Sequence, residues 1–79
     1  MAHVRYFAGA AEAAGVEGEH LEAATVGELL TQMSATRGAE LARVLTRCSL
    51  LVNGVRTDDP TAPLSPADAV DVLPPFAGG

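Results

Sequence analysis

The sequence predicts an α+β fold, in which a mixed sheet of about five strands packs one face against one main helix. Three features of the sequence support this prediction. Segments at both ends of the chain alternate between apolar and polar residues, which is the period of a half-buried strand. A longer central segment carries apolar residues at helical spacing. A short apolar run is followed by Asn-Gly, a pair typical of tight hairpins. Strands interspersed with helices in this order favour an α+β arrangement.

The first predicted strand covers residues 2–7. Alternation places Val4 and Tyr6 on its inner face. The opposite face then carries His3, Arg5 and Phe7. The two histidines of the chain, His3 and His20, are expected at the surface of strands, and no role is assigned to them because no acidic or metal-binding neighbour is evident.

Two short elements are expected after this strand. Residues 8–15 are rich in alanine and predict a short helix that Gly15 closes in a left-handed conformation. Residues 19–23 predict a return strand with Leu21 and Ala23 facing inward, because helical periodicity is absent and the first strand needs a partner.

The main helix is expected to begin after Thr25. Thr25 and Glu28 have the spacing of a capping box, in which each side chain accepts from the other residue's backbone N–H. Gly38 supplies a left-handed stop. The apolar stripe of this helix consists of Val26, Leu29, Leu30 and Met33. A second, shorter helical segment is predicted over residues 39–45.

The last third of the chain predicts a hairpin and a final strand. Residues 49–52 form an apolar strand, Asn53-Gly54 a tight turn, and residues 55–57 the partner strand. Residues 58–66 contain three prolines and are expected to make a surface excursion, with Asp58-Asp59 capping a turn. Residues 69–73 alternate again and predict the last strand.

Composition limits the classes of function. The 79 residues allow one domain, and 48% of them are hydrophobic but only 4% aromatic, so the core is expected to consist of Leu, Val and Ala. A formal net charge of −5 disfavours nucleic acid and anionic membranes and favours protein partners. All five basic residues are arginines, so the chain has no lysine at which it could be joined to itself.

The single cysteine, Cys48, excludes an internal disulfide and is better explained as a small buried hydrophobe than as a reactive thiol. One cysteine and two histidines are too few for a structural metal site. No signal peptide or apolar run of membrane-spanning length is evident. We therefore expect a soluble protein in a reducing cytoplasm.

The chemistry is expected at the end of the chain. Pro74-Pro75 ends the strand pairing, which divides the chain into a domain at 1–73 and a tail at 74–79 that ends in Gly78-Gly79. A terminal carboxylate is ionised at neutral pH and is a poor electrophile, so it needs activation. Transfer to the α-phosphate of ATP gives an acyl-adenylate, from which a sulfur nucleophile displaces AMP to leave a thiocarboxylate. Glycine has no Cβ and fits a narrow channel. No catalytic triad, Cys-His pair, carboxylate pair or phosphate loop is recognisable.

The chain resembles the MoaD/ThiS family of ubiquitin-like sulfur carriers over its whole length. The resemblance depends on these segments: Val4-Arg5-Tyr6-Phe7-Ala8, Thr25 to Glu28, Leu51-Val52-Asn53-Gly54, Pro63-Leu64, Asp68-Ala69-Val70, and Leu73-Pro74-Pro75-Phe76-Ala77-Gly78-Gly79. The Pro-Pro-x-x-Gly-Gly ending is most similar to that of the small subunits of molybdopterin synthase. Where relatives often have Asp-Gly-Asp, this chain has Pro66-Ala67-Asp68, which suits a type I turn and leaves the geometry of that turn open.

The resemblance implies a β-grasp fold and a carrier that is not an enzyme by itself. Gly79 is then adenylated by an E1-like (MoeB-like) activating enzyme, which uses the ATP, and becomes a thiocarboxylate. Gly78 gives access to it, and the chain itself binds no cofactor. A molybdopterin synthase large subunit (MoaE-like) then receives the tail, in a heterotetramer, and the sulfur enters precursor Z to build the dithiolene of molybdopterin.

Several alternatives remain at the level of the sequence. The same tail would serve sulfur transfer to thiazole, cysteine or a secondary metabolite, or the tagging of other proteins. A passive interaction module is the alternative of another class, and for Gly78-Gly79 the simplest alternative is a frayed end. Phe76 lies beyond the prolines and is expected to anchor the tail on a partner. Phe7, Leu51 and Leu73 share one strand face, and they form either a docking patch or scattered surface residues.

Overall fold

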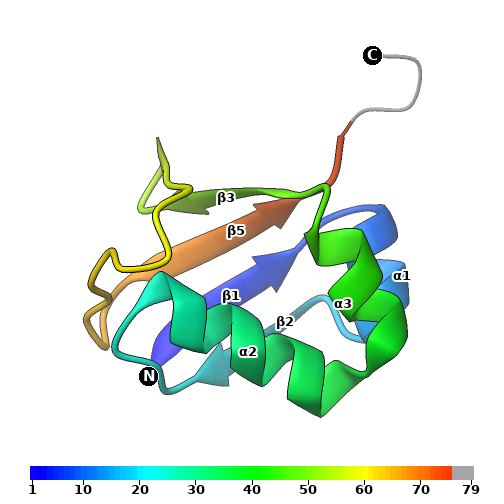
Figure 1. The fold of residues 1–79 in the computed structure, drawn as a ribbon, viewed down its shortest axis with the longest axis horizontal. Coiled ribbons are helices and arrows are strands. Elements are labelled where there is room, and N and C mark those ends of the chain that lie inside the picture. The colour runs from blue at the N-terminus through cyan, green and yellow to red at the C-terminus, as the bar shows by residue number, and fades with distance from the viewer. Residues whose placement is uncertain (76–79) are drawn as a thin grey trace.

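The computed structural model describes residues 1–75, which form a five-stranded mixed sheet covered on one face by helices (Figure 1). The elements run β1 (Ala2–Tyr6), α1 (Gly9–Ala14), β2 (Gly18–Leu21), α2 (Val26–Arg37), α3 (Ala39–Leu45), β3 (Ser49–Val52), β4 (Val55–Arg56) and β5 (Ala69–Leu73). The spatial order of the strands is β2-β1-β5-β3-β4. The central strand, β5, is parallel to its neighbour β1, and the other neighbouring pairs are antiparallel. This is the β-grasp architecture that the resemblance implied.

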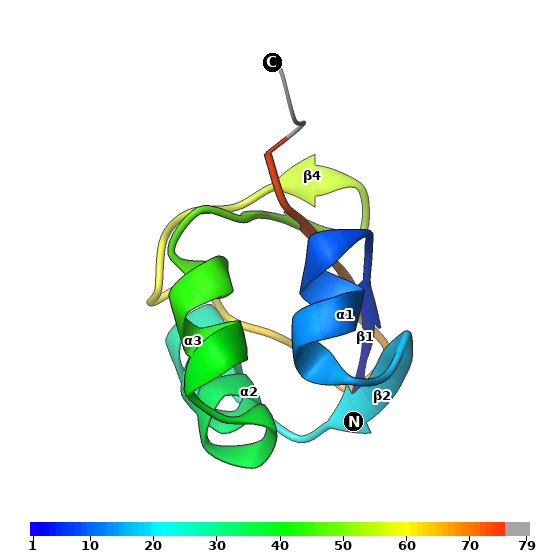
Figure 2. The same ribbon diagram turned by 90° about the vertical axis from the view of Figure 1, so that its right-hand side faces the viewer.

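The helices lie on one side of the sheet, which leaves its other face open (Figure 2). Strand alternation divides the residues between the two faces. Val4, Val70 and Val72 point toward the helices and are completely buried, as are Leu29 and Met33 of α2. The core therefore consists of aliphatic side chains, as the composition predicted. Among residues 1–75, no helix is long and apolar enough to cross a membrane.

The predicted helices are present with small shifts in their bounds. Gly15 closes α1 with φ 81°, and its N–H donates to the carbonyl of Ala11. Gly38 ends α2 with φ 97° and ψ −177°, so its φ is positive but it does not adopt the left-handed helical conformation that was predicted, because the chain continues directly into α3. The capping box is only half formed. The N–H of Glu28 donates to Thr25 Oγ1 at 3.2 Å, as predicted, but the carboxylate of Glu28 accepts from the hydroxyl of Thr25 at 3.4 Å instead of from its backbone N–H.

The Asn-Gly hairpin is confirmed. Asn53 and Gly54 have φ values of 50° and 84°, which are the positive angles of a tight turn. The side chain of Asn53 also joins two strands, because its Oδ1 accepts from the N–H of Ala69 at 2.9 Å while its Nδ2 donates to Asp68. The turn at Pro66-Ala67 closes with a 3.0 Å bond from the N–H of Asp68 to the carbonyl of Ser65. Neither Pro66 nor Ala67 has a positive φ, which fits the type I turn.

The excursion between β4 and β5 is less superficial than predicted. Leu64 is buried in the core. The carbonyls of Pro60 and Ala62 accept from the N–H groups of Gly27 and Val26. The first turn of a helix leaves its N–H groups without partners, and here the excursion supplies them. The sequence suggested only turns in this region because these contacts depend on the tertiary fold. The expected cap at Asp59 is present, since its Oδ1 accepts from the N–H of Thr61.

Candidate functional site: the end of the sheet where the tail begins

The tail begins at the C-terminal end of the central strand, β5. β1 and β5 are parallel neighbours, so the chain leaves both strands at the same end of the sheet. β1 is one residue shorter than predicted, but the N–H of Phe7 still donates to the carbonyl of Val72 at 3.1 Å. Pro74 is half-buried and Pro75 is exposed, and neither can extend the ladder as a donor. The chain thus leaves the sheet directly after Leu73, at the end of the molecule opposite to its N-terminus (Figure 1).

An apolar hollow of about 690 Å³ lies at this point. Four of the residues predicted to bind partners line it: Phe7, Leu73, Pro74 and Pro75. Phe7 is 38% exposed, which makes it one of the few large hydrophobic side chains at the surface of the described chain. Exposed aromatic side chains in apolar hollows are frequent anchors of protein interfaces.

Leu51 does not line this hollow. It is half-buried on the open face of β3, where it lies opposite Asp71 of β5 and Arg56 of β4. The alternation of residues therefore placed Leu51 on the correct face of the sheet. It could not show that Leu51 lies opposite Asp71, two residues before Leu73 in β5, and so away from the start of the tail.

Three residues of the hollow were missed by sequence reasoning: Ala8, Gly9 and Ser49. Ser49 lies opposite Leu73 in the antiparallel pair of β3 and β5. Ala8 has the unusual dihedral angles φ 49° and ψ −124°, which turn the chain from β1 into α1. The only feature that the sequence shows at these three positions is a small side chain or none, and this does not identify a site.

An ion pair neutralises the open face next to the hollow. Arg5 donates to Asp71 through Nε at 2.8 Å and Nη2 at 2.9 Å, and this contact raises the pKa of Arg5 above its ordinary value. The guanidinium carbon of Arg5 also lies 5.5 Å from the centroid of the Phe7 ring. That distance is within the range of a cation–π contact, so Arg5 helps to hold the Phe7 ring in place.

A second polar network joins the sheet to α2 on the covered side. The hydroxyl of Tyr6 donates to Glu19 Oε2 at 2.6 Å, and Arg37 Nη2 donates to Glu19 Oε1 at 2.7 Å. The hydrogen bond from Arg37 lowers the pKa of Glu19, whereas burial raises the pKa of Tyr6 above its ordinary value. The network places Glu19 beside the residue that ends α2, so its role is to fix the helix on the sheet.

The remaining candidates for chemistry have structural explanations. Cys48 is half-buried, its Sγ donates to the carbonyl of Val44 at 3.3 Å, and burial raises its pKa, which favours the unreactive thiol. His3 and His20 stack across β1 and β2 with ring centroids 4.6 Å apart. Sequence reasoning placed both at the surface but missed this pairing. Among residues 1–75, no group of three or more His, Cys, Asp or Glu side chains could hold a metal ion.

Phe76, Gly78 and Gly79 lie outside the described residues. Their predicted roles depend on the strand and the two prolines that precede them.

Comparison with known proteins agrees with this arrangement. The sequence profile of the ThiS family matches residues 4–79. A search of curated proteins finds no match. Small archaeal modifier protein 1 from Haloferax volcanii has a TM-score of 0.85 at 25% identity, over 99% of this chain and 98% of its own. A chain from the complex of subunits 1 and 2 of molybdopterin-converting factor from Helicobacter pylori has a TM-score of 0.77 at 26% identity, over 99% and 97%. A second Haloferax volcanii protein is 32% identical with a TM-score of 0.76, over 99% and 85%.

The fold and the strand that runs directly into Pro74-Pro75 define a class, the small ubiquitin-like sulfur carriers and modifiers. Within that class the chain belongs to the ThiS family.

Proposed function

We propose that this chain is the sulfur-carrying small subunit of a molybdopterin synthase. The observation that supports this most is the apolar hollow formed by Phe7, Leu73, Pro74 and Pro75 at the start of the tail, in a chain similar to one from the complex of subunits 1 and 2 of molybdopterin-converting factor. A partner that covers this hollow receives the tail at the same time.

The reaction has two steps on the terminal residue. An E1-like activating enzyme transfers the carboxylate of Gly79 to the α-phosphate of ATP and releases pyrophosphate. Hydrosulfide from the sulfur donor then displaces AMP from the acyl-adenylate, so that the carbon–oxygen bond to the phosphate breaks, a carbon–sulfur bond forms, and a thiocarboxylate and AMP result. Gly78 adds no side chain and lets the end of the chain enter a narrow active site. Phe76 contributes an anchor on the partner. The domain at 1–73 contributes the docking surface together with Pro74 and Pro75, and the chain supplies no catalytic group.

The downstream partner in this proposal is a MoaE-like large subunit, in a heterotetramer in which each large subunit accepts one tail. The sulfur passes from Gly79 to precursor Z. All of these steps take place in the cytoplasm and involve neither nucleic acid nor a membrane.

The direct test is intact-mass analysis after incubation with the E1-like enzyme of the same organism, ATP and a sulfur donor. We expect the mass to rise by one oxygen-to-sulfur exchange in the full chain and to stay unchanged in a chain that lacks Gly79. The two chains should unfold at the same temperature, because the last described strand ends at Leu73, six residues before Gly79. A second carrier of the family that the same enzyme activates serves as the positive control. If the control gains mass and the full chain does not, the proposal is contradicted.

A role as a protein modifier is the second candidate, and the similarity to small archaeal modifier protein 1 favours it. The same activated tail would then form an isopeptide bond with a lysine of another protein. The chain has no lysine, so any conjugate must be with a different protein or with an N-terminal amine. Recovery of conjugates from cells, in place of a complex with a synthase large subunit, would favour this candidate. Sulfur delivery to thiazole, cysteine or another metabolite would instead be shown by capture of the corresponding synthase.

A further inference from the structure

The open face of the sheet carries an ion pair next to the start of the tail. In the parallel pair of β1 and β5, Arg5 lies opposite Asp71. The alternation of strand residues places Phe7 and Leu73, two residues further along, on the same face. Both of these apolar residues line the hollow where the tail begins. The ion pair is therefore directly adjacent to the proposed docking surface.

Phe7 lies at the boundary of two hollows. It lines the hollow of about 690 Å³ at the start of the tail and also a second hollow of about 470 Å³, which Arg5 and Glu17 line as well. β1 ends one residue before Phe7, and Phe7 is 38% exposed. An exposed side chain changes its rotamer rapidly unless a contact holds it. Because there is open space on both sides, the ring needs such a contact to keep one position.

Arg5 supplies this contact. Its guanidinium carbon lies over the ring of Phe7, 5.5 Å from the ring centroid. A cation–π contact at an exposed site favours one position of the ring by about two- to fivefold. A free arginine side chain has many rotamers, so the contact is effective only if the guanidinium is itself held in place.

Asp71 holds the guanidinium. Its two carboxylate oxygens accept from Arg5 Nε at 2.8 Å and from Arg5 Nη2 at 2.9 Å. Two parallel hydrogen bonds fix the plane of the guanidinium as well as its position, which a single bond does not. The side chain of Asp71 is only 17% exposed, whereas that of Arg5 is 53% exposed. The carboxylate is therefore the fixed end of the pair, and Arg5 is the end that reaches Phe7.

We infer that Asp71 is a positioning residue of the docking surface: it holds Arg5, and Arg5 holds the Phe7 ring in the orientation that the synthase large subunit binds. This inference rests on the proposed function, which names the large subunit as the partner that covers the hollow. A partner that binds one position of the ring has its affinity reduced by the fraction of chains in which the ring lies elsewhere. Asp71 therefore raises the affinity by fixing Phe7 before the partner binds, and it needs no contact with the partner itself.

The first test is NMR spectroscopy of the free chain. Protons that lie over the face of an aromatic ring resonate upfield, so the Hδ resonances of Arg5 report how often its guanidinium end lies over Phe7. D71N keeps the shape of the side chain but removes its charge. We expect the upfield shift of the Arg5 Hδ protons to fall by at least half in D71N and to be absent in F7A.

The second test is calorimetric titration of the chain with the large subunit of the same organism. We expect D71N and R5K each to weaken the binding about two- to fivefold, the range of the cation–π contact. R5K leaves the net charge of −5 unchanged but lacks the planar fork, so its loss of affinity cannot come from the net charge. In the F7A background, D71N should have no further effect, because no ring remains to be positioned.

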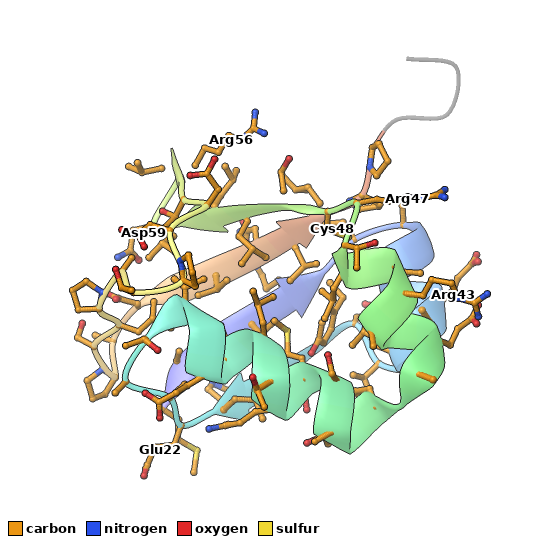
Figure 3. The ribbon with its side chains drawn as sticks, in the orientation of Figure 1. Glu22, Arg43, Arg47, Cys48, Arg56 and Asp59 are labelled. Carbon is orange, nitrogen blue, oxygen red and sulfur yellow. The ribbon has the colours of Figure 1, made fainter. Side chains whose placement is uncertain are left out.

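The matched control is E40Q, which has the same change of charge as D71N. Glu40 of α3 accepts from Arg43 at 2.6 Å, and Figure 3 shows Arg43 on the flank of α3, directed away from the tail. We expect E40Q to leave both the Arg5 resonances and the affinity unchanged. Ion pairs at the surface contribute little to stability, so the thermal midpoints of D71N, R5K and E40Q should stay within a few degrees of that of the wild type.

An unchanged upfield shift in D71N would overturn the inference. An equal loss of affinity on D71N substitution in the wild-type and F7A backgrounds would also overturn it, because Asp71 would then act on the partner directly and not through the ring. A wild-type chain that does not bind the large subunit would overturn the proposed function, and the Arg5 resonances would still decide whether Asp71 positions the ring.

Discussion

The two faces of the sheet consist of alternate residues of the same strands, but the side chains on one face are buried and those on the other are partly exposed. On the covered face, Val4 and Val72 are completely buried, and Tyr6 is only 4% exposed with its hydroxyl bound to Glu19. On the open face, the intervening and following residues include Arg5, which is ion-paired, and Phe7, which is 38% exposed. Within residues 1–75, the covered face is therefore buried by the chain's own helices, whereas the open face leaves the ring of Phe7 partly exposed.

Within a single strand, the residues on the covered face therefore stabilise the fold, whereas those on the open face are available to bind a partner. A chain of 79 residues buries only about 60% of the surface of its unfolded form, so nearly all of its stability must come from one face. The open face is then available for binding with little effect on folding. Substitutions on the two faces should accordingly have distinct consequences, in stability for one and in binding for the other.

The largest effect is expected from a cavity on the covered face. Leu29 is completely buried in α2, and L29A should lower the free energy of unfolding by about 3 kcal/mol, because it removes buried methyl groups and leaves a void. The matched variant L51A on the half-buried open face should cost about 1 kcal/mol. Urea denaturation of the two variants measures the comparison, and equal losses would refute the division between the faces.

The next effect belongs to the open face and to binding. F7A should weaken the affinity for the activating enzyme or the synthase large subunit by about 2 kcal/mol, or about thirtyfold, because the ring lines the hollow beside the tail. Its effect on unfolding should be small, since the ring is partly exposed already. V55A is the control, because Val55 is 66% exposed in β4 and lies outside the hollow. Equal affinities of F7A and V55A, measured by calorimetry, would remove Phe7 from the interface.

A smaller effect is expected from the polar network that joins the covered face to α2. E19Q should lower the free energy of unfolding at neutral pH by about 1.5 kcal/mol, because it replaces hydrogen bonds to a charged carboxylate by weaker neutral ones. The hydrogen bond from Arg37 lowers the pKa of Glu19 in the folded state. The ionised Glu19 therefore stabilises the fold fully at pH values above 4.5, the ordinary pKa of a glutamate, and this stabilisation is lost as the pH falls through the lowered pKa of the folded state.

The pH dependence is the discriminating part of this prediction. Wild type and E19Q should differ by a constant amount above about pH 5 and converge at lower pH. Thermal unfolding at a series of pH values measures the difference. Curves that stay parallel below pH 4 would show that the charge of Glu19 does not stabilise the fold.

The sequence predicted most of the fold because its local signals agree with the tertiary structure. The positive φ of Gly38, the Asn53-Gly54 turn and the alternation of β5 all depend on neighbouring residues alone. Contacts that depend on register or on tertiary packing were not predictable. The stacking of His3 on His20 follows from the pairing of β1 with β2, and the burial of Leu64 follows from the return of the excursion to α2.

The candidate site was predictable in part for the same reason. Phe7 and Leu73 were assigned to one face by parity, and Pro74-Pro75 marked the end of pairing. The absence of Leu51 from the hollow could not be foreseen, because it depends on which residues lie opposite each other in β3 and β5.

The smallest expected effect lies at the junction of the two faces, where β1 turns into α1. Ala8 has φ 49° and ψ −124°, a conformation in which an L-residue with a Cβ is strained and glycine is not. A8G should therefore raise the free energy of unfolding by about 0.5 to 1 kcal/mol, the relief of strain exceeding the added entropy of the unfolded chain. The control is A13G, in which a helical alanine of α1 is replaced and stability should fall by about 1 kcal/mol. Ala8 also lines the hollow, so the strained turn holds Phe7 and α1 in the arrangement that forms the docking surface. If this is correct, A8G gains stability while its affinity for the activating enzyme falls, and a variant that gains both would show that the strain serves no function.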